Sequence, residues 1–291
     1  MDDDRFRELI TARVSRPAAI AEAAAKRRRP TSLLADHGRL MMIAADHPAR
    51  GALAAGSRPF AMGDRVDLLD RLVLALSRPG VNGVLGTPDV LEDLLLLGAL
   101  DDKVVIGSMN RGGLAGTVFE LDDRFTAYDA QSIAEAGFEG GKMLTRIDPN
   151  DPATVVTLES CADAVSDLAR HRLLAMVEPF ISHRAEGRVR NELTADAMVR
   201  ANSIAAGLGS TSAYTWLKVP IVDEMERAMA ATTLPALILG GEVAEDQQAA
   251  FANWQKALAL PTVQGLVIGR SLLYPPGDDV AAAVDTAVGL L

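Results

Sequence analysis

Cysteine, basic charge and long apolar runs are all scarce in this sequence. Its 291 residues include one cysteine, Cys161, so no disulfide can form within the chain, which favours a reducing compartment. The longest leucine run, Leu94–Leu97, is far shorter than the roughly 20 apolar residues of a membrane span. The acidic start, Met-Asp-Asp-Asp, has the wrong charge for a secretory signal. We therefore expect a soluble, cytoplasmic protein with no membrane partner. A homo-oligomer is also expected.

The chain carries a net charge of −10, from 39 acidic and 29 basic residues. Binding to a nucleic-acid backbone requires a broad basic face, so nucleic acid is not an expected partner. A small anionic substrate is compatible with this charge, because one phosphate needs only a few local donors. The basic run Lys26–Arg29 is interpreted as the end of an alanine-rich helix, where cations are favoured.

Length and composition fit one (β/α)8 barrel with a short extension, which together form a single domain over residues 1–291. Such a barrel needs about 250 residues, and 49% of this chain is hydrophobic. Residues 1–37 are predicted to form an N-terminal helical extension, in which a second helix covers Ala18–Arg29 and ends at Pro30. Residues 38–291 are predicted to form the barrel, since no linker divides them.

From residue 40 onward, short apolar runs alternate with longer amphipathic stretches. The candidate strands are Leu40–Ala45, Gly83–Leu85, Val104–Gly107, Lys142–Thr145, Leu173–Val177, Thr215–Val219, Ala236–Leu239 and Leu266–Ile268. The candidate helices include Val66–Ser77, Val90–Leu100, Leu158–Arg170, Ala195–Gly207, Glu245–Leu258 and Val280–Leu290. Eight such units favour a closed parallel barrel over an open Rossmann sheet, and no Gly-x-Gly-x-x-Gly follows the first strand. The long loop at 109–137 is a candidate lid.

Four charged residues fall at or near the ends of apolar strands, where a barrel carries its active site. They are Asp46, Lys142, Glu178 and Lys218, on the first, fourth, fifth and sixth strands. A lone lysine or carboxylate at such a position is usually an exposed charge or a helix cap. Two acids and two lysines in one barrel interior are costly to bury unless they pair, so the combination favours a catalytic site.

This mixture of charges suits chemistry through a lysine Schiff base. An amine must lose its proton to attack a ketone, and burial or a second nearby cation disfavours the ammonium form. Lys218 is predicted to form the imine because Trp216-Leu217 and Val219-Pro220 surround it with apolar side chains. Lys142, beside a polar turn, is predicted to be the positive neighbour, while the carboxylates move protons. No metal or other cofactor is expected.

A phosphate site is predicted in the loops after the seventh and eighth strands, where barrels often bind phosphate. Gly240-Gly241 and Gly269-Arg270 occupy these loops. Glycine amides can approach an anion closely, and an arginine can bind it through two hydrogen bonds. The expected partner is therefore a small sugar phosphate.

Residues 40–275 resemble the class I aldolases of the tagatose-1,6-bisphosphate aldolase group, including the aldolase-like domain associated with bacterial inositol catabolism. The segment 45–53, Ala-Asp-His-Pro-Ala-Arg-Gly-Ala-Leu, resembles the family's first-strand Asp-Gln-Arg-Gly-Ala-Leu, with a longer spacing. Lys142 with the acidic turn after it, Glu178-Pro179, Leu217-Lys218-Val219 and Gly269-Arg270-Ser271 are similar to its later motifs.

The resemblance implies cleavage of 2-deoxy-5-keto-gluconate 6-phosphate to dihydroxyacetone phosphate and malonate semialdehyde. One departure bears on the substrate. The family often has Tyr-Tyr after the fourth-strand lysine, whereas this chain has Leu144-Thr145-Arg146, and Arg146 could reach a carboxylate or a phosphate.

Three alternatives stay open at this point. A metal-dependent enzyme would need a cluster of ligands, and among the four histidines His47, beside Asp46, is the best candidate; His37 and His171 precede strands and are expected at the opposite end of the barrel. A deoxyribose-phosphate aldolase would carry a second lysine on the seventh strand. In this chain that strand reads Leu234-Pro-Ala-Leu-Ile-Leu-Gly240 and contains no lysine, which ranks this alternative lower. A barrel that binds a sugar phosphate without turnover is the non-enzymatic alternative.

Overall fold

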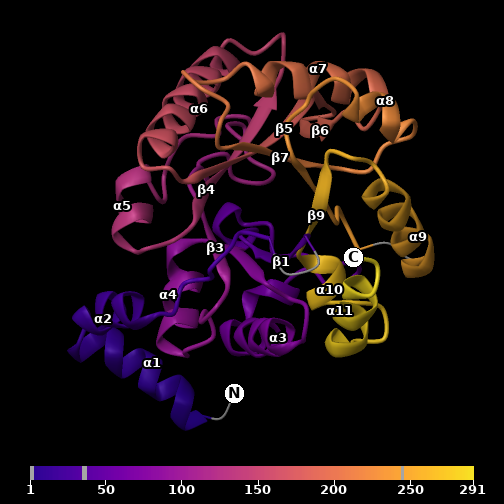
Figure 1. Cartoon of the computed structure of the whole chain (residues 1–291). Coiled ribbons are helices and arrows are strands. Elements are labelled where there is room, and N and C mark those ends of the chain that lie inside the picture. The colour runs from indigo at the N-terminus through magenta and orange to yellow at the C-terminus, as the bar shows by residue number, and fades with distance from the viewer. Residues whose placement is uncertain (1–2, 35–37, 244–245) are drawn as a thin grey trace.

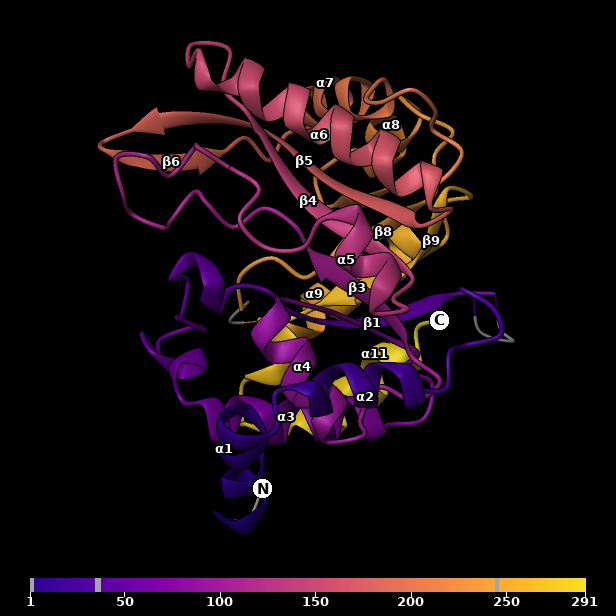
Figure 2. The same ribbon diagram turned by 90° about the vertical axis from the view of Figure 1, so that its left-hand side faces the viewer.

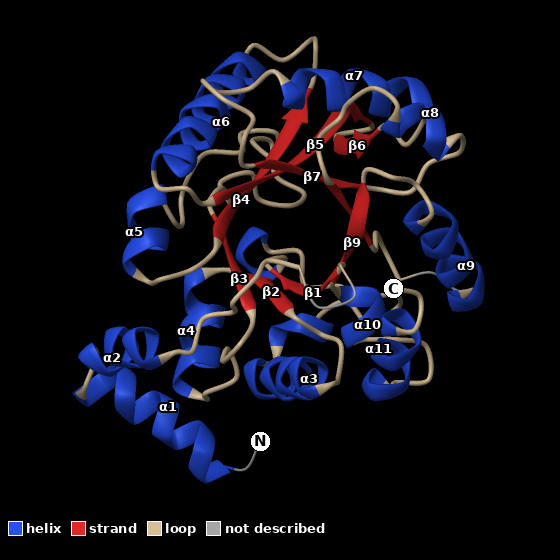
Figure 3. Cartoon of the chain, in the orientation of Figure 1, coloured by secondary structure: helices blue, strands red, loops and turns tan. Residues whose placement is uncertain are grey.

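Eight parallel strands form a closed barrel in the computed structural model, which describes residues 3–34, 38–243 and 246–291 (Figure 1, Figure 3). The strands of the chain are β1 (Leu40–Ala45), β2 (Gly83–Gly86), β3 (Val104–Ser108), β4 (Gly140–Ile147), β5 (Leu174–Ala185), β6 (Arg188–Asn191), β7 (Thr215–Val219), β8 (Ala236–Leu239) and β9 (Val263–Ile268). Each barrel strand pairs in parallel with its neighbours in the order β4-β3-β2-β1-β9-β8-β7-β5, and β4 pairs with β5 to close the ring. The predicted (β/α)8 barrel is confirmed.

Helices surround the barrel. They are α3 (Arg65–Ser77), α4 (Pro88–Leu96), α5 (Ala130–Glu135), α6 (Ala153–Arg170), α7 (Ala195–Ala206), α8 (Met225–Met229), α9 (Gln247–Leu258), α10 (Arg270–Leu273) and α11 (Val280–Val288), with short 3-10 turns η1 (Pro48–Arg50) and η2 (Ala61–Gly63). Asp64 illustrates how they begin, since its side chain accepts hydrogen bonds from the amides of Val66 and Asp67. Two residues named above lie outside the described residues: Glu245, the predicted first residue of the helix that ends at Leu258, and His37.

Side chains alternate along each strand, which produces one apolar core between the strands and the helices and a second one inside the barrel. On β1, Met41, Ile43 and Ala45 pack outward against the helices, whereas Leu40, Met42 and Ala44 point into the barrel. The inward cluster also contains Leu85, Val104, Ile106, Leu174, Met176, Leu237 and Val267. The next inward position after Ala44 is residue 46, so the apolar interior of the barrel ends where the charged side chains begin.

One strand pair extends beyond the barrel. β5 continues past the predicted Val177 to Ala185 and turns back as β6, and Figure 2 shows this hairpin projecting from the rest of the sheet. Glu186 and Gly187 form its two-residue turn, and both have positive φ (52° and 75°), as the favoured hairpin turns require. The hairpin was not predicted from the sequence.

The N-terminal extension consists of α1 (Asp3–Ser15) and α2 (Ala18–Lys26), and α2 packs beside α4 (Figure 1). Of the basic run Lys26–Arg29, only Lys26 lies in the last turn of this helix, so the predicted extension of the helix to Arg29 is wrong. Arg27 is buried instead: its guanidinium donates to the carbonyl of Lys103 (2.9 Å) and to Glu139 Oε1 (2.9 Å). Glu139 also accepts from Arg29 Nε (3.0 Å). The arginines therefore attach the extension to the end of the barrel at which the strands begin.

No helix in the described part of the chain combines enough length with enough apolar character to cross a membrane.

Candidate active site

A cavity of about 470 Å³ opens at the carboxyl ends of the barrel strands. All nine residues predicted for the site line it: Asp46, Lys142, Arg146, Glu178, Lys218, Gly240, Gly241, Gly269 and Arg270. They lie on or just after six of the eight barrel strands, β1, β4, β5, β7, β8 and β9. The convergence of strand ends, more than proximity in sequence, brings these side chains together.

Basic and acidic side chains alternate in a continuous chain across the floor of the cavity. Asp46 Oδ2 lies 3.1 Å from Arg111 Nη2 and 3.2 Å from Lys142 Nζ. Lys142 also contacts Glu178 Oε2, and Glu178 Oε1 lies 3.1 Å from Lys218 Nζ. Each of these side chains is at most 10% exposed. Two lysines thus share two carboxylates in a site largely removed from water.

Burial and the charges of their neighbours shift the pKa values of these buried side chains. Burial and the Arg111 charge lower the pKa of Lys142 to about 8, although Asp46 and Glu178 oppose the shift. Burial would raise the pKa of Glu178, but Lys142 and Lys218 outweigh it and hold that pKa at about 2. The pKa of Asp46 is likewise well below its ordinary value, because Arg111 and the two lysines overcome the effect of burial. Lys142 therefore loses its proton at a lower pH than an ordinary exposed lysine.

The setting of Lys142 differs from the polar one expected from the turn that follows it. Its side chain is 1% exposed, because β4 continues to Ile147 and places the turn beyond the cavity floor. Lys218 is also buried, on β7 between its neighbours β5 and β8, and it forms an ion pair with Glu178. Position and burial alone thus make both amines candidates for the nucleophile.

His47 follows Asp46 and lines the same cavity. Its Nδ1 lies 3.8 Å from Asp46 Oδ1, and burial, helped by the charge of Arg270, lowers the pKa of His47 to about 3. The imidazole is therefore neutral. Among the described residues, no group of three histidine, cysteine, aspartate or glutamate side chains is arranged to hold a metal ion. His171 caps the end of α6, at the end of the barrel remote from the cavity, and His183 lies on β5 beside Glu192.

The predicted phosphate loops meet at one side of the cavity. Gly240 and Gly241 follow β8, while Gly269 and Arg270 follow β9, and these two strands are neighbours. Arg270 Nη1 lies 2.8 Å from Glu242 Oε2, and its buried Nε has no hydrogen-bond partner among the described residues. Gly269 has little room for a side chain, since a Cβ there would collide with the carbonyl of Ala44. This side of the cavity offers three glycines and one incompletely bonded guanidinium.

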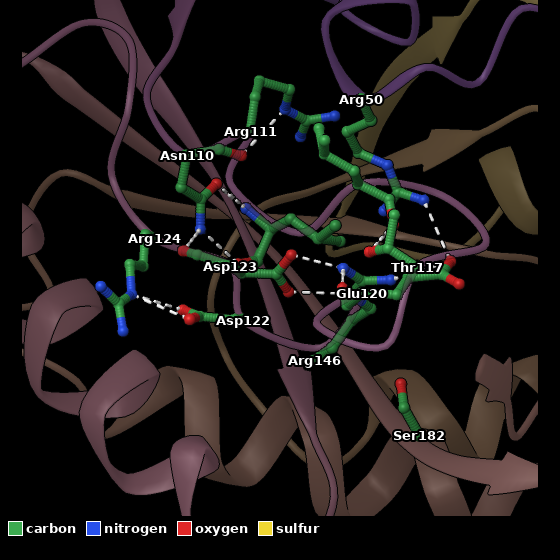
Figure 4. A network of polar contacts seen from close by, with 12 residues as sticks. Arg50, Asn110, Arg111, Thr117, Glu120, Asp122, Asp123, Arg124, Arg146 and Ser182 are labelled. Atoms are coloured by element: carbon green, nitrogen blue, oxygen red, sulfur yellow. Dashed lines mark hydrogen bonds and ion pairs between the residues drawn. The ribbon is translucent and has the colours of Figure 1, made fainter. Parts of the chain in front are cut away.

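The opposite side contains residues that the sequence reasoning missed. The loop between β3 and α5, residues 109–129, contributes Arg111 and Glu120 to the cavity, and η1 contributes Arg50. Arg146 Nε donates to Asp123 Oδ2 (2.9 Å), and the Arg146 guanidinium also contacts Glu120 (Figure 4). Arg146 thus binds this loop, and its contact with a substrate stays a prediction. A signal for Arg111 was present in the sequence: an arginine three positions after the end of the third strand, immediately before Gly112-Gly113.

The β5–β6 hairpin forms part of the rim. Val189, Arg190 and Asn191 line the cavity. Arg184 Nη2 donates to the carbonyl of Val118 (2.7 Å), so the hairpin and the β3–α5 loop are joined above the strands, as Figure 2 shows. Both segments lie outside the regular barrel, and together they narrow one side of its mouth.

Comparison with known protein families identifies the family of this chain. The Cgl0159-like family matches residues 38–288. The chain belongs to the Cgl0159-like family. The crystal structure of Cgl0159 from Corynebacterium glutamicum (Brevibacterium flavum) is 52% identical, with a TM-score of 0.97 over 100% of this chain and 97% of that one. No curated protein matches the sequence.

More distant structures share the fold of this Cgl0159-like protein. A Schiff-base-forming fructose-1,6-bisphosphate aldolase is 18% identical and has a TM-score of 0.66, over 93% of this chain and 99% of that one. An archaeal fructose-1,6-bisphosphate aldolase is 17% identical, also with a TM-score of 0.66, over 93% and 98%. At 17–18% identity, this similarity shows only that these proteins share the barrel fold.

Proposed function

We propose that this Cgl0159-like protein is a class I aldolase that cleaves a ketose or deoxyketose phosphate through an imine on Lys218. The observation that carries the proposal is the buried chain in which Asp46, Lys142, Glu178 and Lys218 alternate in charge. Binding of a phosphate alone would not need two amines in such a setting, since exposed cations or backbone amides suffice. The similarity in fold to Schiff-base aldolases supports the same chemistry.

In the proposed reaction, Lys218 Nζ attacks the ketone carbon and forms a carbinolamine. Loss of water gives an iminium ion, which withdraws electrons from the adjacent carbon–carbon bond. A base takes the proton of the hydroxyl on the departing carbon, the bond breaks, and an aldehyde leaves. The remaining enamine is protonated on carbon, and water then hydrolyses the imine to release the second product and free Lys218.

The geometry supports separate proton roles for the neighbouring groups. Glu178 lies 3.1 Å from Lys218 and is ionised at neutral pH, so it can accept a proton from the attacking amine. Lys142, with a pKa of about 8, is suited to donate the proton that leaves with the carbinolamine hydroxyl. Asp46 holds Lys142 in place, at 3.2 Å.

The substrate phosphate is proposed to bind at Gly240-Gly241 and Gly269-Arg270. As the sequence resemblance implies, the candidate substrate is 2-deoxy-5-keto-gluconate 6-phosphate, and the products are dihydroxyacetone phosphate and malonate semialdehyde. Activity against a panel of ketose and deoxyketose phosphates would test this choice.

Borohydride trapping tests the mechanism. Reduction in the presence of dihydroxyacetone phosphate should fix a three-carbon adduct on the peptide that contains Lys218, as mass spectrometry would show. Lys218→Met should abolish the adduct. Lys142→Met should still form it, but more slowly, because the proposed proton donor for the carbinolamine hydroxyl is lost.

Lys256→Met is the matched control, because Lys256 lies in the last turn of α9, away from the cavity lining. An adduct on Lys142 would exchange the roles of the two lysines. Turnover without an adduct on either lysine would refute the Schiff-base mechanism.

A further inference from the structure

Three arginines gather on the side of the cavity opposite the predicted phosphate loops. Arg111 follows β3, Arg146 lies on β4, and Arg50 belongs to η1 after β1 (Figure 4). In the ring of eight strands, β4 is separated from β9 by three strands in either direction, so β4 lies across the barrel from the Gly269-Arg270 loop. The two lysines lie on the floor between these sides.

The arginine side carries more positive charge than its carboxylates balance. Five cations, Arg50, Arg111, Arg146, Lys142 and Lys218, meet only four carboxylates, Asp46, Glu120, Asp123 and Glu178, and Arg111 shares Asp46 with Lys142. Asp123 is engaged by Arg146, and Glu120 is shared between Arg146 and Arg50. One cation is thus left without a matching anion in a buried setting, which is costly unless a ligand supplies the charge.

Arg50 and Arg111 both line the cavity, and neither guanidinium is fully hydrogen-bonded among the described residues. Arg111 is 6% exposed, and its Nη2, although 3.1 Å from Asp46 Oδ2, has no hydrogen-bond partner among the described residues. Arg50 Nη2 lies 3.7 Å from Glu120 Oε1, beyond hydrogen-bond distance. Burial and the charges of Arg146 and Arg111 lower the pKa of Arg50 to about 10, which reflects the same crowding of cations.

Arg146 has a different part in this arrangement. It donates through Nε and Nη2 to the two carboxylate oxygens of Asp123, at 2.9 and 2.5 Å, and so fixes the β3–α5 loop. Gly113 packs against this pair closely enough that a Cβ would collide with it. Asn110 Nδ2 also donates to the carbonyls of Leu144 and Asp123, which ties the start of the loop to β4. The loop therefore holds Arg111 in place over the cavity.

We infer that Arg50 and Arg111 form a second anion subsite, which binds an anionic group on the part of the substrate that leaves as the aldehyde. This inference rests on the proposed aldolase function. The single unmatched cation fits a carboxylate, whose two oxygens can accept from the planar guanidinium groups. The substrate would then carry a negative charge at each end, with its reacting carbons over Lys218.

Calorimetric titration with 3-hydroxypropanoate tests the subsite without turnover, and 1,3-propanediol serves as the uncharged ligand of the same length. Loss of a charge-assisted hydrogen bond weakens binding by about tenfold to a hundredfold, so Arg50→Gln should raise the Kd of 3-hydroxypropanoate by that factor. Arg124→Gln is the matched control: Arg124 belongs to the same loop but is 74% exposed and pairs with Asp122 (Figure 4). Inorganic phosphate is titrated in parallel, to show whether the subsite binds a carboxylate or a phosphate.

The condensation direction gives a second readout. Dihydroxyacetone phosphate is combined with malonate semialdehyde or its uncharged methyl ester, and the ratio of the two kcat/KM values is compared between variants. Arg50→Gln and Arg111→Lys should lower this ratio, by about tenfold or more for Arg50→Gln, whereas Arg124→Gln should leave it unchanged.

The outcomes separate the subsite from the aldolase mechanism. Binding of 3-hydroxypropanoate that Arg50→Gln leaves unchanged, or that Arg270→Ala removes instead, would overturn the subsite even if borohydride trapping succeeds. Failure of trapping, with anion binding that depends on Arg50, would retain the subsite and reject the aldolase mechanism.

Discussion

The pH dependence of activity should report the ionisation of Lys142, and substitution of Asp46 provides a test with a definite sign. Lys142 has a pKa of about 8, so the unmodified enzyme should lose kcat/KM as the pH rises above about 8 and this amine loses its proton. The Asp46 carboxylate, 3.2 Å away, stabilises the ammonium form and thus raises this pKa. Asp46→Asn should therefore move the alkaline decline to lower pH.

The size of the shift follows from the charge that is removed. Two unit charges about 3 Å apart interact by about 5 kcal/mol at an effective dielectric constant of about 20. Arg111 and Ser108 also contact Asp46 Oδ2, so only part of this energy acts on Lys142. If about a quarter remains, the pKa falls by about one unit, since one unit corresponds to about 1.4 kcal/mol. The alkaline midpoint should then lie near pH 7 or below.

The assay is the pH profile of kcat/KM at constant ionic strength, because this parameter reports groups of the free enzyme. Arg111→Gln should shift the midpoint in the opposite direction, above 8, since the Arg111 charge lowers the pKa of Lys142. Asp122→Asn, in the same loop but paired with Arg124, is the control and should leave the midpoint unchanged. A midpoint that stays near 8 in both Asp46→Asn and Arg111→Gln would show that Lys142 is not the titrating group.

Two further substitutions test the phosphate site and the attachment of the extension. Arg270→Ala should raise KM for the phosphorylated substrate by about tenfold to a hundredfold with the circular dichroism spectrum unchanged, since a charge-assisted bidentate contact is lost; an unchanged KM would remove Arg270 from the site. Arg27→Ala should lower the free energy of unfolding by about 3 kcal/mol in urea titrations, because Glu139 would remain buried with only the half-exposed Arg29 beside it, whereas exposed Arg7→Ala should have little effect. Equal stability of the two variants would contradict this role of Arg27.

The barrel and most of its site could be predicted from the sequence for a simple physical reason. A parallel strand covered on both faces is continuously apolar, so runs such as Leu40–Ala45 and Thr215–Val219 are conspicuous. A charge at the end of such a run is correspondingly unusual. For this reason Asp46 and Lys218 could be recognised as cavity residues without knowledge of their contacts.

The parts that were missed lack such a pattern. The β5–β6 hairpin is rich in polar residues, because much of it projects beyond the barrel, and its one clear signal was the turn at Glu186-Gly187. Arg50, Arg111 and Glu120 are single charges in irregular segments, where no periodicity indicates which way a side chain points. Arg146 was recognised, but its partner Asp123 is 23 residues earlier, and that pairing exists only in the folded chain.

The attachment of the N-terminal helices has a consequence for the order in which the protein assembles during synthesis. Arg27 bonds to Glu139, 112 positions later in the chain, and to the carbonyls of Lys103 and Gly137. The ribosome must therefore produce the first three strands before Arg27 can make these bonds, whereas α1 can already bond to α4 through Arg13 and Asp93. Contacts between such distant positions close large loops and form late. A nascent chain that stalls before residue 139 should leave the segment around Arg27 open to proteases, whereas one that has passed it should protect that segment.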